Sequence, residues 1–218
     1  HYDATTCVLA SAPFCGAFGF ATLISGLLAG HRVVFEPVST PESLLALVKR
    51  HGVTHTYANN ALLLQMLQAS THRDDFASCQ LFGLASFAPA QHELFERARE
   101  NGVTLTGLYG SSELMALTAA QPLSSSEGDI SVRHEPGGRL LHDQARVRAR
   151  DPESGHLLPA GQSGEIEILT PSHMVGYLDQ GPATQAAFTP DGYFKTSDLG
   201  WCVSDRQFVF QARLGDAM

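Results

Sequence analysis

The sequence Val103-Thr104-Leu105-Thr106-Gly107-Leu108-Tyr109-Gly110-Ser111-Ser112-Glu113 predicts a strand that runs into a polar turn. Its first half is rich in β-branched residues, which favours a strand. Its second half supplies an aromatic ring, a glycine, two hydroxyls and a carboxylate. Ligands of open parallel sheets bind beyond the carboxyl ends of the strands, where such groups can contact a base, a phosphate and Mg²⁺. An ordinary glycine turn with a solvated glutamate explains these residues equally well, so the flanking sequence has to decide.

Upstream of this turn, predicted strands and helices alternate. Thr40 and Pro41 predict the start of one helix, and Gly52 predicts its end. Repeated strand–helix units of this length predict parallel pairing with right-handed crossovers. The almost wholly apolar segment 17–29 predicts a buried helix, too short for a membrane span of about 20 residues. The predicted strands are 32–35, 53–57, 80–85 and 103–108, and the later helices are 60–68 and one that ends at 101.

Downstream, long helical patterns largely disappear. Short alternating segments at 145–150, 165–169 and 207–211 predict strands, separated by turns rich in Gly and Pro. We therefore predict an α/β fold with a parallel sheet flanked by helices over residues 1–122. A smaller, mostly antiparallel and distorted barrel-like β subdomain follows over residues 123–211. The two turns 86–88 and 109–113 follow neighbouring predicted strands, so we expect them to face one crevice.

The composition excludes several classes of protein. The 218 residues are 44% hydrophobic and 17% charged, which is typical of a globular protein with a sizeable core. The formal net charge of -8 and the lack of a basic cluster argue against a nucleic-acid partner. Four widely spaced cysteines without metal-ligand spacing favour a reducing, cytoplasmic setting. The chain lacks an initiator methionine and ends at Met218, which predicts a piece of a longer protein. No basic region opens it, so we predict no signal peptide, and we expect no transmembrane segment in these residues.

Five short motifs then occur in a fixed order. Each is weak alone, but their order and spacing along almost the whole chain form a strong signal. They are Pro13–Phe20, Tyr109–Glu113, Gly164-Glu165 with the later Gly176-Tyr177, Phe194–Gly200 and Ala212–Asp216. In this order they resemble the adenylate-forming enzymes, the AMP-binding superfamily of acyl-CoA synthetases, aryl-CoA ligases, peptide-synthetase adenylation domains and luciferases.

The resemblance implies roles for the residues that match those motifs. The segment Ser86, Phe87, Ala88 and Pro89 matches the backbone that lies along the adenine, and Tyr109, followed by Gly110, matches the ring beside the base. Ser112 replaces a threonine that contacts the phosphate of the adenylate and keeps its hydroxyl. Glu113 matches the carboxylate linked to Mg²⁺.

Two further matches lie near the end of the chain. Asp198 matches the carboxylate that accepts both ribose hydroxyls, for which it has enough lone pairs. Arg213 matches an arginine that contacts ribose and phosphate, and residues 212–218 match the start of a hinge to a further domain. The alternatives are a turn carboxylate for Asp198 and a solvated charge at a strand end for Arg213. The chain departs from the family pattern where Ser197 and Ala212 stand in place of glycines and Gly215 in place of an Asp or Lys.

The first motif bears on the acid that is activated. Members of the family that activate α-amino acids hold the ammonium group with an aspartate in this segment, and residues 13–20 contain no carboxylate. Phe14, Phe18 and Phe20, together with Gly16 in place of a family histidine, indicate a fatty, alicyclic or aromatic acyl group. We take Phe14, Gly16 and Phe20 as the substrate-binding candidates.

The resemblance implies part of an ATP-dependent carboxylic acid:CoA ligase that uses ATP/AMP, Mg²⁺ and CoA. The family's phosphate loop would precede His1 and its lid lysine would follow Met218, so we expect the 218 residues to be inactive alone. A non-catalytic or degenerate nucleotide- or acyl-binding module, and a structural α/β interaction domain, are the alternatives. An uncovered apolar face around residues 14–28 predicts self-association or packing against the N-terminal portion.

Overall fold

A computed structural model describes residues 3–85, 92–121 and 137–215. The chain forms two compact units, which divide between Gly107 and Leu108. The boundary that the sequence predicts, near residues 122–128, lies outside the described residues. Each unit is described by itself below.

The first unit contains a parallel sheet, as the strand–helix alternation predicts. Its order is β2 (Arg32–Val34), β1 (Cys7–Leu9), β3 (His55–Asn59), β4 (Leu81–Ala85) and β5 (Leu105–Tyr109). Strands β2, β1, β3 and β4 pair in parallel. The sequence did not predict β1, because a short run of apolar residues does not distinguish a strand from a buried helix segment.

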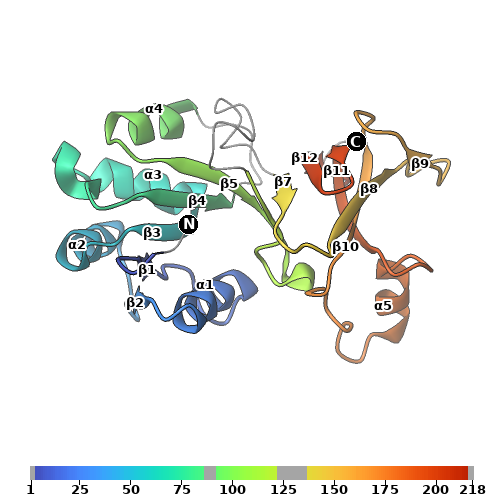
Figure 1. Cartoon of the computed structure of the whole chain (residues 1–218), viewed down its shortest axis with the longest axis horizontal. Helices are drawn as coiled ribbons and strands as arrows, with labels where there is room; N and C mark the ends of the chain where they lie inside the picture. Colours follow the sequence, from blue (N-terminus) through green and yellow to red (C-terminus); the bar gives the residue numbers. More distant parts are fainter. Residues whose placement is uncertain (1–2, 86–91, 122–136, 216–218) are drawn as a thin grey trace. The chain divides into compact units, whose positions relative to one another are not determined.

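Three helices form one layer against this sheet: α2 (Pro41–His51), α3 (Asn60–Ala69) and α4 (His92–Glu100). Figure 1 shows them in a row beside the strands. The predicted ends of α2 are confirmed: the Thr40 side chain accepts a hydrogen bond from the Ser43 N–H at 3.2 Å, and Gly52 is left-handed with φ 62°. A short 3₁₀ helix (Arg73–Phe76) interrupts the loop after α3. The layer buries Leu44, Val48, Leu63, Met66 and Leu94 against Cys7, Leu9, Phe82 and Leu84 of the sheet.

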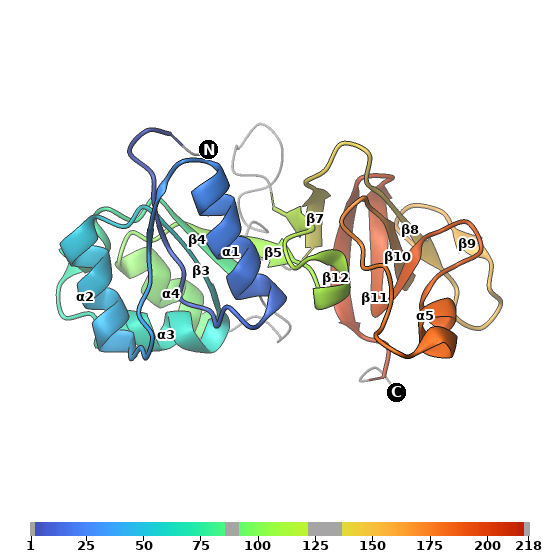
Figure 2. The ribbon, with the colours of Figure 1, turned by 90° about the horizontal axis from the view of Figure 1, so that it is seen from below.

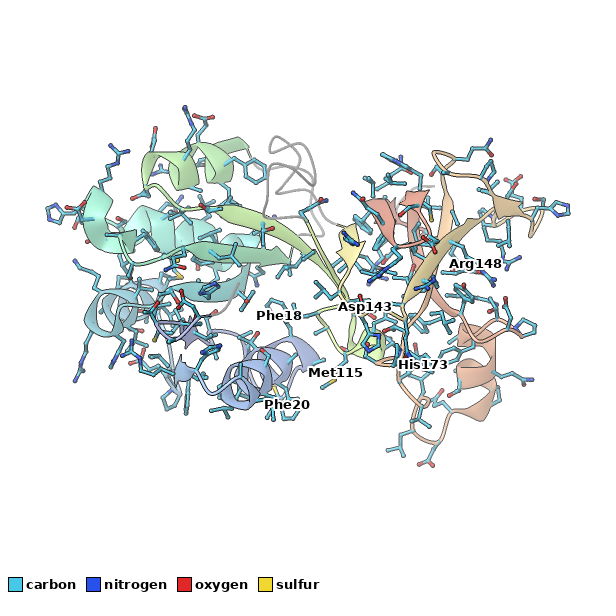
Figure 3. All side chains as sticks on the ribbon, viewed as in Figure 1. Phe18, Phe20, Met115, Asp143, Arg148 and His173 are labelled. Atoms are coloured by element: carbon cyan, nitrogen blue, oxygen red, sulfur yellow. The ribbon has the colours of Figure 1, made fainter. Side chains whose placement is uncertain are left out.

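Helix α1 (Ala17–Leu28) covers the other face of the sheet (Figure 2). A Cβ atom at Gly26 would lie 2.7 Å from the Val33 side chain. The helix therefore packs so closely on the strands that only glycine fits at position 26. The outward side of α1 is apolar and open, with Phe20 43%, Leu27 54% and Leu28 84% exposed. Figure 3 labels Phe20 on this helix. The prediction of a buried helix is therefore wrong for this side, because small residues face the sheet and large ones face away. No helix within the described ranges has the length and apolar character that a bilayer span requires.

The second unit is a mainly antiparallel sheet with β6 (Ala119–Ala120), β7 (Gly137–Leu140), β12 (Gln207–Arg213), β11 (Phe194–Ser204), β10 (Gly164–Leu169), β8 (Arg146–Arg150) and β9 (Leu157–Leu158) in this order. The last two residues of β5 pair with β6. The antiparallel prediction is confirmed, but the strands described here form an open sheet and not a closed barrel. The helix α5 (Gly181–Ala187) precedes β11.

A buried carboxylate joins β10 to β8 in this unit. Glu167 is fully buried and lies directly opposite Arg148, which Figure 3 labels on β8. Arg148 Nε donates to Glu167 Oε2 at 2.5 Å, and Arg150 Nε donates to Oε1 at 2.6 Å. The guanidinium of Arg148 also lies 3.8 Å from the centre of the Tyr193 ring and pairs with Asp191 at 2.6 Å. Both arginines keep partial contact with solvent, so the carboxylate is the group with no route to water.

Removal of the Glu167 carboxylate tests this network. We expect Glu167→Ala to lower the free energy of unfolding of the second unit by about 2–4 kcal/mol, because the two arginines lose their buried partner and a cavity forms. Trp201, the single tryptophan of the chain, lies on β11, and its fluorescence reports the unfolding of this unit in urea. Glu153→Ala in an exposed turn is the control, expected within about 0.5 kcal/mol of the unaltered chain. Equal midpoints for the two variants would show that the network adds nothing to stability.

Candidate functional site

The turn after β5 folds tightly back on itself. A Cβ atom at Gly110 would lie 1.2 Å from the Ala116 carbonyl oxygen, so only glycine fits there. The Ala116 N–H donates to the Ser111 carbonyl at 2.7 Å, and Met115 and Ala116 both have left-handed backbones with φ 59° and 68°. A 3₁₀ turn (Ser112–Leu114) lies between Ser111 and Met115 and carries two of the predicted residues, Ser112 and Glu113.

Tyr109 ends β5 inside the core of the second unit. Its hydroxyl donates to Asp198 Oδ2 at 2.5 Å, and its ring packs edge-on against Phe208 with centroids 4.9 Å apart. The ring is 1% exposed. Burial, followed by the charge of Asp198, raises the pKa of the Tyr109 phenol well above its usual value, so this tyrosine is a permanent hydrogen-bond donor.

Asp198 also pairs with Arg213 on the neighbouring strand. The two residues are register partners of β11 and β12, and Arg213 Nη1 lies 3.0 Å from Asp198 Oδ1. The Asp198 side chain is 3% exposed, while that of Arg213 is 47% exposed. Burial raises the pKa of Asp198, and the contacts with Tyr109 and Arg213 oppose the rise. The ion pair therefore has one buried end and one end that is open to exchange.

Glu113 is the second carboxylate of the site. The Tyr177 hydroxyl donates to Glu113 Oε1 at 3.0 Å, and the Met174 N–H donates to the Glu113 carbonyl at 2.6 Å. Burial raises the pKa of Glu113, but its own backbone N–H and the side chains of Ser111 and Tyr177 lower it by more, so the net pKa lies below the usual value. Glu113 is therefore a carboxylate at neutral pH.

A pocket of about 360 Å³ lies in the second unit beside these groups. Glu113 and Arg213 reach it, whereas Tyr109, Ser112 and Asp198 are not among the residues that line it. The lining side chains bring together both signs of charge, hydroxyls and the small residues of α5: Ser111, Glu113, Glu165, Tyr177, Ala183, Ala186, Ala187, Phe194, Lys195, Thr196, Ser197 and Arg213.

The structure thus brings together one part of the predicted site. Tyr109, Asp198 and Arg213 contact one another, and Glu113 shares the pocket with Arg213. Ser112 is exposed on the turn, and the neighbouring Ser111 lines the pocket instead. Which of two adjacent hydroxyls points inward depends on the backbone angles of the turn, which the motif does not give.

The remaining predicted residues lie elsewhere. The adenine segment Ser86–Pro89 is outside the described residues. Phe14, Gly16 and Phe20 belong to the first unit, around the start of α1. Phe14 packs edge-on against Phe35 with centroids 5.3 Å apart, Gly16 is the exposed residue that precedes the helix, and Phe20 is partly exposed.

Sequence reasoning predicted a site role for only Glu113 and Arg213 among the residues that line the pocket, and three of the others lie within the five motifs or beside them and carry an ionisable side chain. Tyr177 and Glu165 lie in the quoted Gly-Tyr and Gly-Glu motifs and received no role, and Lys195 lies next to Thr196 in the fourth motif. Lys195 Nζ donates to the Ala186 carbonyl at the end of α5, at 3.2 Å. The motifs contained the signal, but only the fold shows that all three side chains reach one pocket.

The arrangement can hold an anionic ligand and a hard cation. Lys195 and Arg213 supply positive charge for phosphates, and the Glu113 carboxylate suits Mg²⁺, which keeps several waters and needs only one or two protein carboxylates beside substrate phosphates. No group of three or more His, Cys, Asp or Glu side chains that could hold a metal ion occurs among the described residues. A metal ion here would therefore be bound jointly by the Glu113 carboxylate and by the phosphates of a ligand.

Known proteins resemble the chain over most of its length. It is 31% identical over 217 residues, 97% of this chain and 38% of the other, to a 4-coumarate–CoA ligase-like protein 4 of Oryza sativa subsp. japonica. It is 30% identical over 185 residues, 84% of this chain and 62% of the other, to a 4-coumarate–CoA ligase 1 of Glycine max. The chain thus spans between about one third and two thirds of the length of these relatives.

A solved structure shares the fold. The o-succinylbenzoate coenzyme A synthetase MenE of Bacillus subtilis, in complex with ATP and a magnesium ion, has a TM-score of 0.81 at 22% identity. The similarity covers 99% of this chain and 43% of that one. The sequence model described as "AMP-binding enzyme" matches residues 1–178. The resemblance that the five motifs indicate is confirmed, and the chain belongs to the AMP-binding enzyme family.

Proposed function

We propose that this chain is part of an ATP-dependent carboxylic acid:CoA ligase. In the reaction, the carboxylate attacks the α-phosphate of ATP to give an acyl-adenylate and pyrophosphate, and the thiol of CoA then displaces AMP. The observation that carries the proposal is the convergence of four motifs on one pocket. Glu113 comes from the second motif, Glu165 and Tyr177 from the third, Ser197 from the fourth and Arg213 from the fifth. The family membership and the relatives named above support the same reaction class.

The Asp198–Arg213 pair is proposed to open when a nucleotide binds. Arg213, whose side chain is 47% exposed, turns to the phosphate and frees Asp198 Oδ1 for the ribose hydroxyls. Tyr109 keeps Oδ2 in place during this exchange through its 2.5 Å hydrogen bond. The buried carboxylate therefore never loses all of its partners at once, which limits the cost of the exchange.

Glu113 is proposed to hold Mg²⁺ together with the phosphates. When bound, Mg²⁺ neutralises phosphate charge as the pyrophosphate leaves. Tyr177 orients the carboxylate through Oε1, and Ser111 and Lys195 face the same pocket. These residues position and stabilise charge and do not form covalent bonds to the substrate.

The acid is proposed to be a plain carboxylic acid with a fatty, alicyclic or aromatic group. Residues 13–20 carry no carboxylate that could pair with an α-ammonium group. The two curated relatives above are named as ligases, or ligase-like proteins, of 4-coumarate, an aromatic acid. The open apolar side of α1 is proposed to pack against another part of the ligase or a second copy.

Asp198→Ala tests the ribose assignment in the full-length ligase. Charge-assisted hydrogen bonds contribute about 1.5–3 kcal/mol each, so we expect AMP affinity to fall by about tenfold to a few hundredfold. Affinity for the carboxylic acid is expected to stay within about twofold of the unaltered protein. Asp205→Ala, on the same hairpin but exposed, is the control. Calorimetric titrations of AMP and of the acid measure both, and an AMP affinity within twofold of the unaltered protein would make Asp198 a turn carboxylate only.

Glu113→Gln separates metal binding from nucleotide binding. Glutamine keeps an oxygen that can accept the Tyr177 hydrogen bond, so the turn is expected to stay folded. The loss of charge is expected to lower turnover by more than tenfold and to raise the Mg²⁺ concentration needed for half-maximal rate, with AMP affinity nearly unchanged. Acid-dependent pyrophosphate release at varied Mg²⁺ measures this, with Glu153→Gln as the control. Loss of AMP affinity in parallel with turnover would contradict the metal role.

The 218-residue chain alone is expected to be inactive. It spans 38% and 62% of the two curated relatives, and the family's phosphate loop and lid lysine have no match among its motifs. Each supplies charge stabilisation that positioning does not replace. The measurement is acid-dependent pyrophosphate release by the purified chain against a heat-inactivated control. Release above that control would show that these 218 residues suffice.

A further inference from the structure

Ser197 has an unusual backbone for a residue with a side chain. Its φ is 56°, in the left-handed region that favours glycine, and the family pattern has a glycine at this position of the fourth motif. Two hydrogen bonds hold this conformation. The Ser197 N–H donates to Glu165 Oε1 at 3.2 Å, and the Leu214 N–H donates to the Ser197 carbonyl at 2.9 Å.

The residue with this backbone lies at the pocket. Ser197 is exposed and lines the pocket, whereas its neighbour Asp198 is 2% exposed and does not. On the other side, the Thr196 hydroxyl donates to the Ile166 carbonyl at 2.7 Å inside the sheet. Ser197 is thus the residue of this motif that has a hydroxyl available at the pocket surface.

The charges around Ser197 bear on the ligand group that it meets. The side chain that touches its backbone is the Glu165 carboxylate, which also lines the pocket. A phosphate beside Glu165 would meet like charge, whereas a sugar hydroxyl can donate to a carboxylate and can both donate to and accept from a serine. The side chain that follows in the sequence, Asp198, is the proposed ribose acceptor.

We propose that the Ser197 hydroxyl is a specificity-determining contact to a ribose hydroxyl of the nucleotide, retained at the expense of backbone strain. The inference rests on the proposed function for the identity of the ligand. It assigns to Ser197 a role that a glycine at this position cannot have. Both the strain and the contact are accessible to experiment, and each has its own readout.

The strain is measured on the 218-residue chain by thermal unfolding followed by Trp201 fluorescence. Ser197→Ala keeps a Cβ atom and hence the strain, whereas Ser197→Gly removes it. We expect the Tm of Ser197→Gly to lie about 2–4 °C above that of Ser197→Ala. This comparison does not depend on any ligand. A Tm for the glycine variant at or below that of the alanine variant would overturn the strain argument.

The contact is measured on the full-length gene product by titration with AMP, 2′-deoxy-AMP and 3′-deoxy-AMP. We expect both Ser197→Ala and Ser197→Gly to weaken AMP binding by about 3–10-fold, as for the loss of one neutral hydrogen bond. Affinity for the deoxynucleotide that lacks the contacted hydroxyl is expected to be unchanged by either substitution. Ser204→Ala, the same change on β11 at a residue outside the pocket lining, is the control and is expected to change none of the affinities.

The outcomes separate this inference from the proposed function. If the unaltered protein does not bind AMP, the proposed function fails and this inference fails with it. If the unaltered protein binds AMP and both Ser197 variants bind it equally well, the function stands and the contact is refuted. If all three nucleotides weaken to the same extent in the variants, Ser197 acts on a part of the nucleotide other than the ribose hydroxyls, and the inference is likewise refuted.

Discussion

The second unit depends on the hydrogen bond from the Tyr109 hydroxyl to the Asp198 carboxylate. It joins the end of β5 to the middle of β11, across 89 positions of sequence. A phenol and a carboxylate that are both almost fully buried need one another, because either alone would leave an unpaired polar group in the core. The edge-on packing of the Tyr109 ring on Phe208 fixes the direction of the hydroxyl. The motif around Gly110 and the motif around Asp198 are thereby held in one piece of structure.

Three charged groups that line the pocket beside this bond already have partners. Glu113 is paired with Tyr177, Glu165 with the Ser197 N–H, and Lys195 with the end of α5. A ligand that binds these three groups therefore exchanges hydrogen bonds with them and does not simply add new ones. Such exchange reduces net affinity but favours ligands whose groups match several partners at once, because a partial match leaves polar groups unpaired.

The sequence predicted features that depend on neighbouring residues. Thr40, Pro41 and Gly52 set the ends of α2 through local hydrogen bonds and backbone angles, and the strand–helix alternation led to the parallel sheet. Features that depend on distant residues were missed. The orientation of Tyr109 follows from Phe208 and Asp198, almost a hundred positions away, and the pocket role of Tyr177 follows from the return of its loop to Glu113. Motifs located these residues, but their contacts required the fold.

The close approach of α1 to the sheet has a consequence for how the helix can change in sequence. On the inner side, Gly26 lies so near Val33 that one added methyl group would force the helix or the strand to shift. On the outer side, Leu28 is 84% exposed and its size has no such limit within this unit. The smallest residues of α1, Gly26 and the still more crowded Gly19, are therefore under the strictest steric selection. Tolerance to substitution along this helix should vary with the turn of the helix rather than with side-chain size.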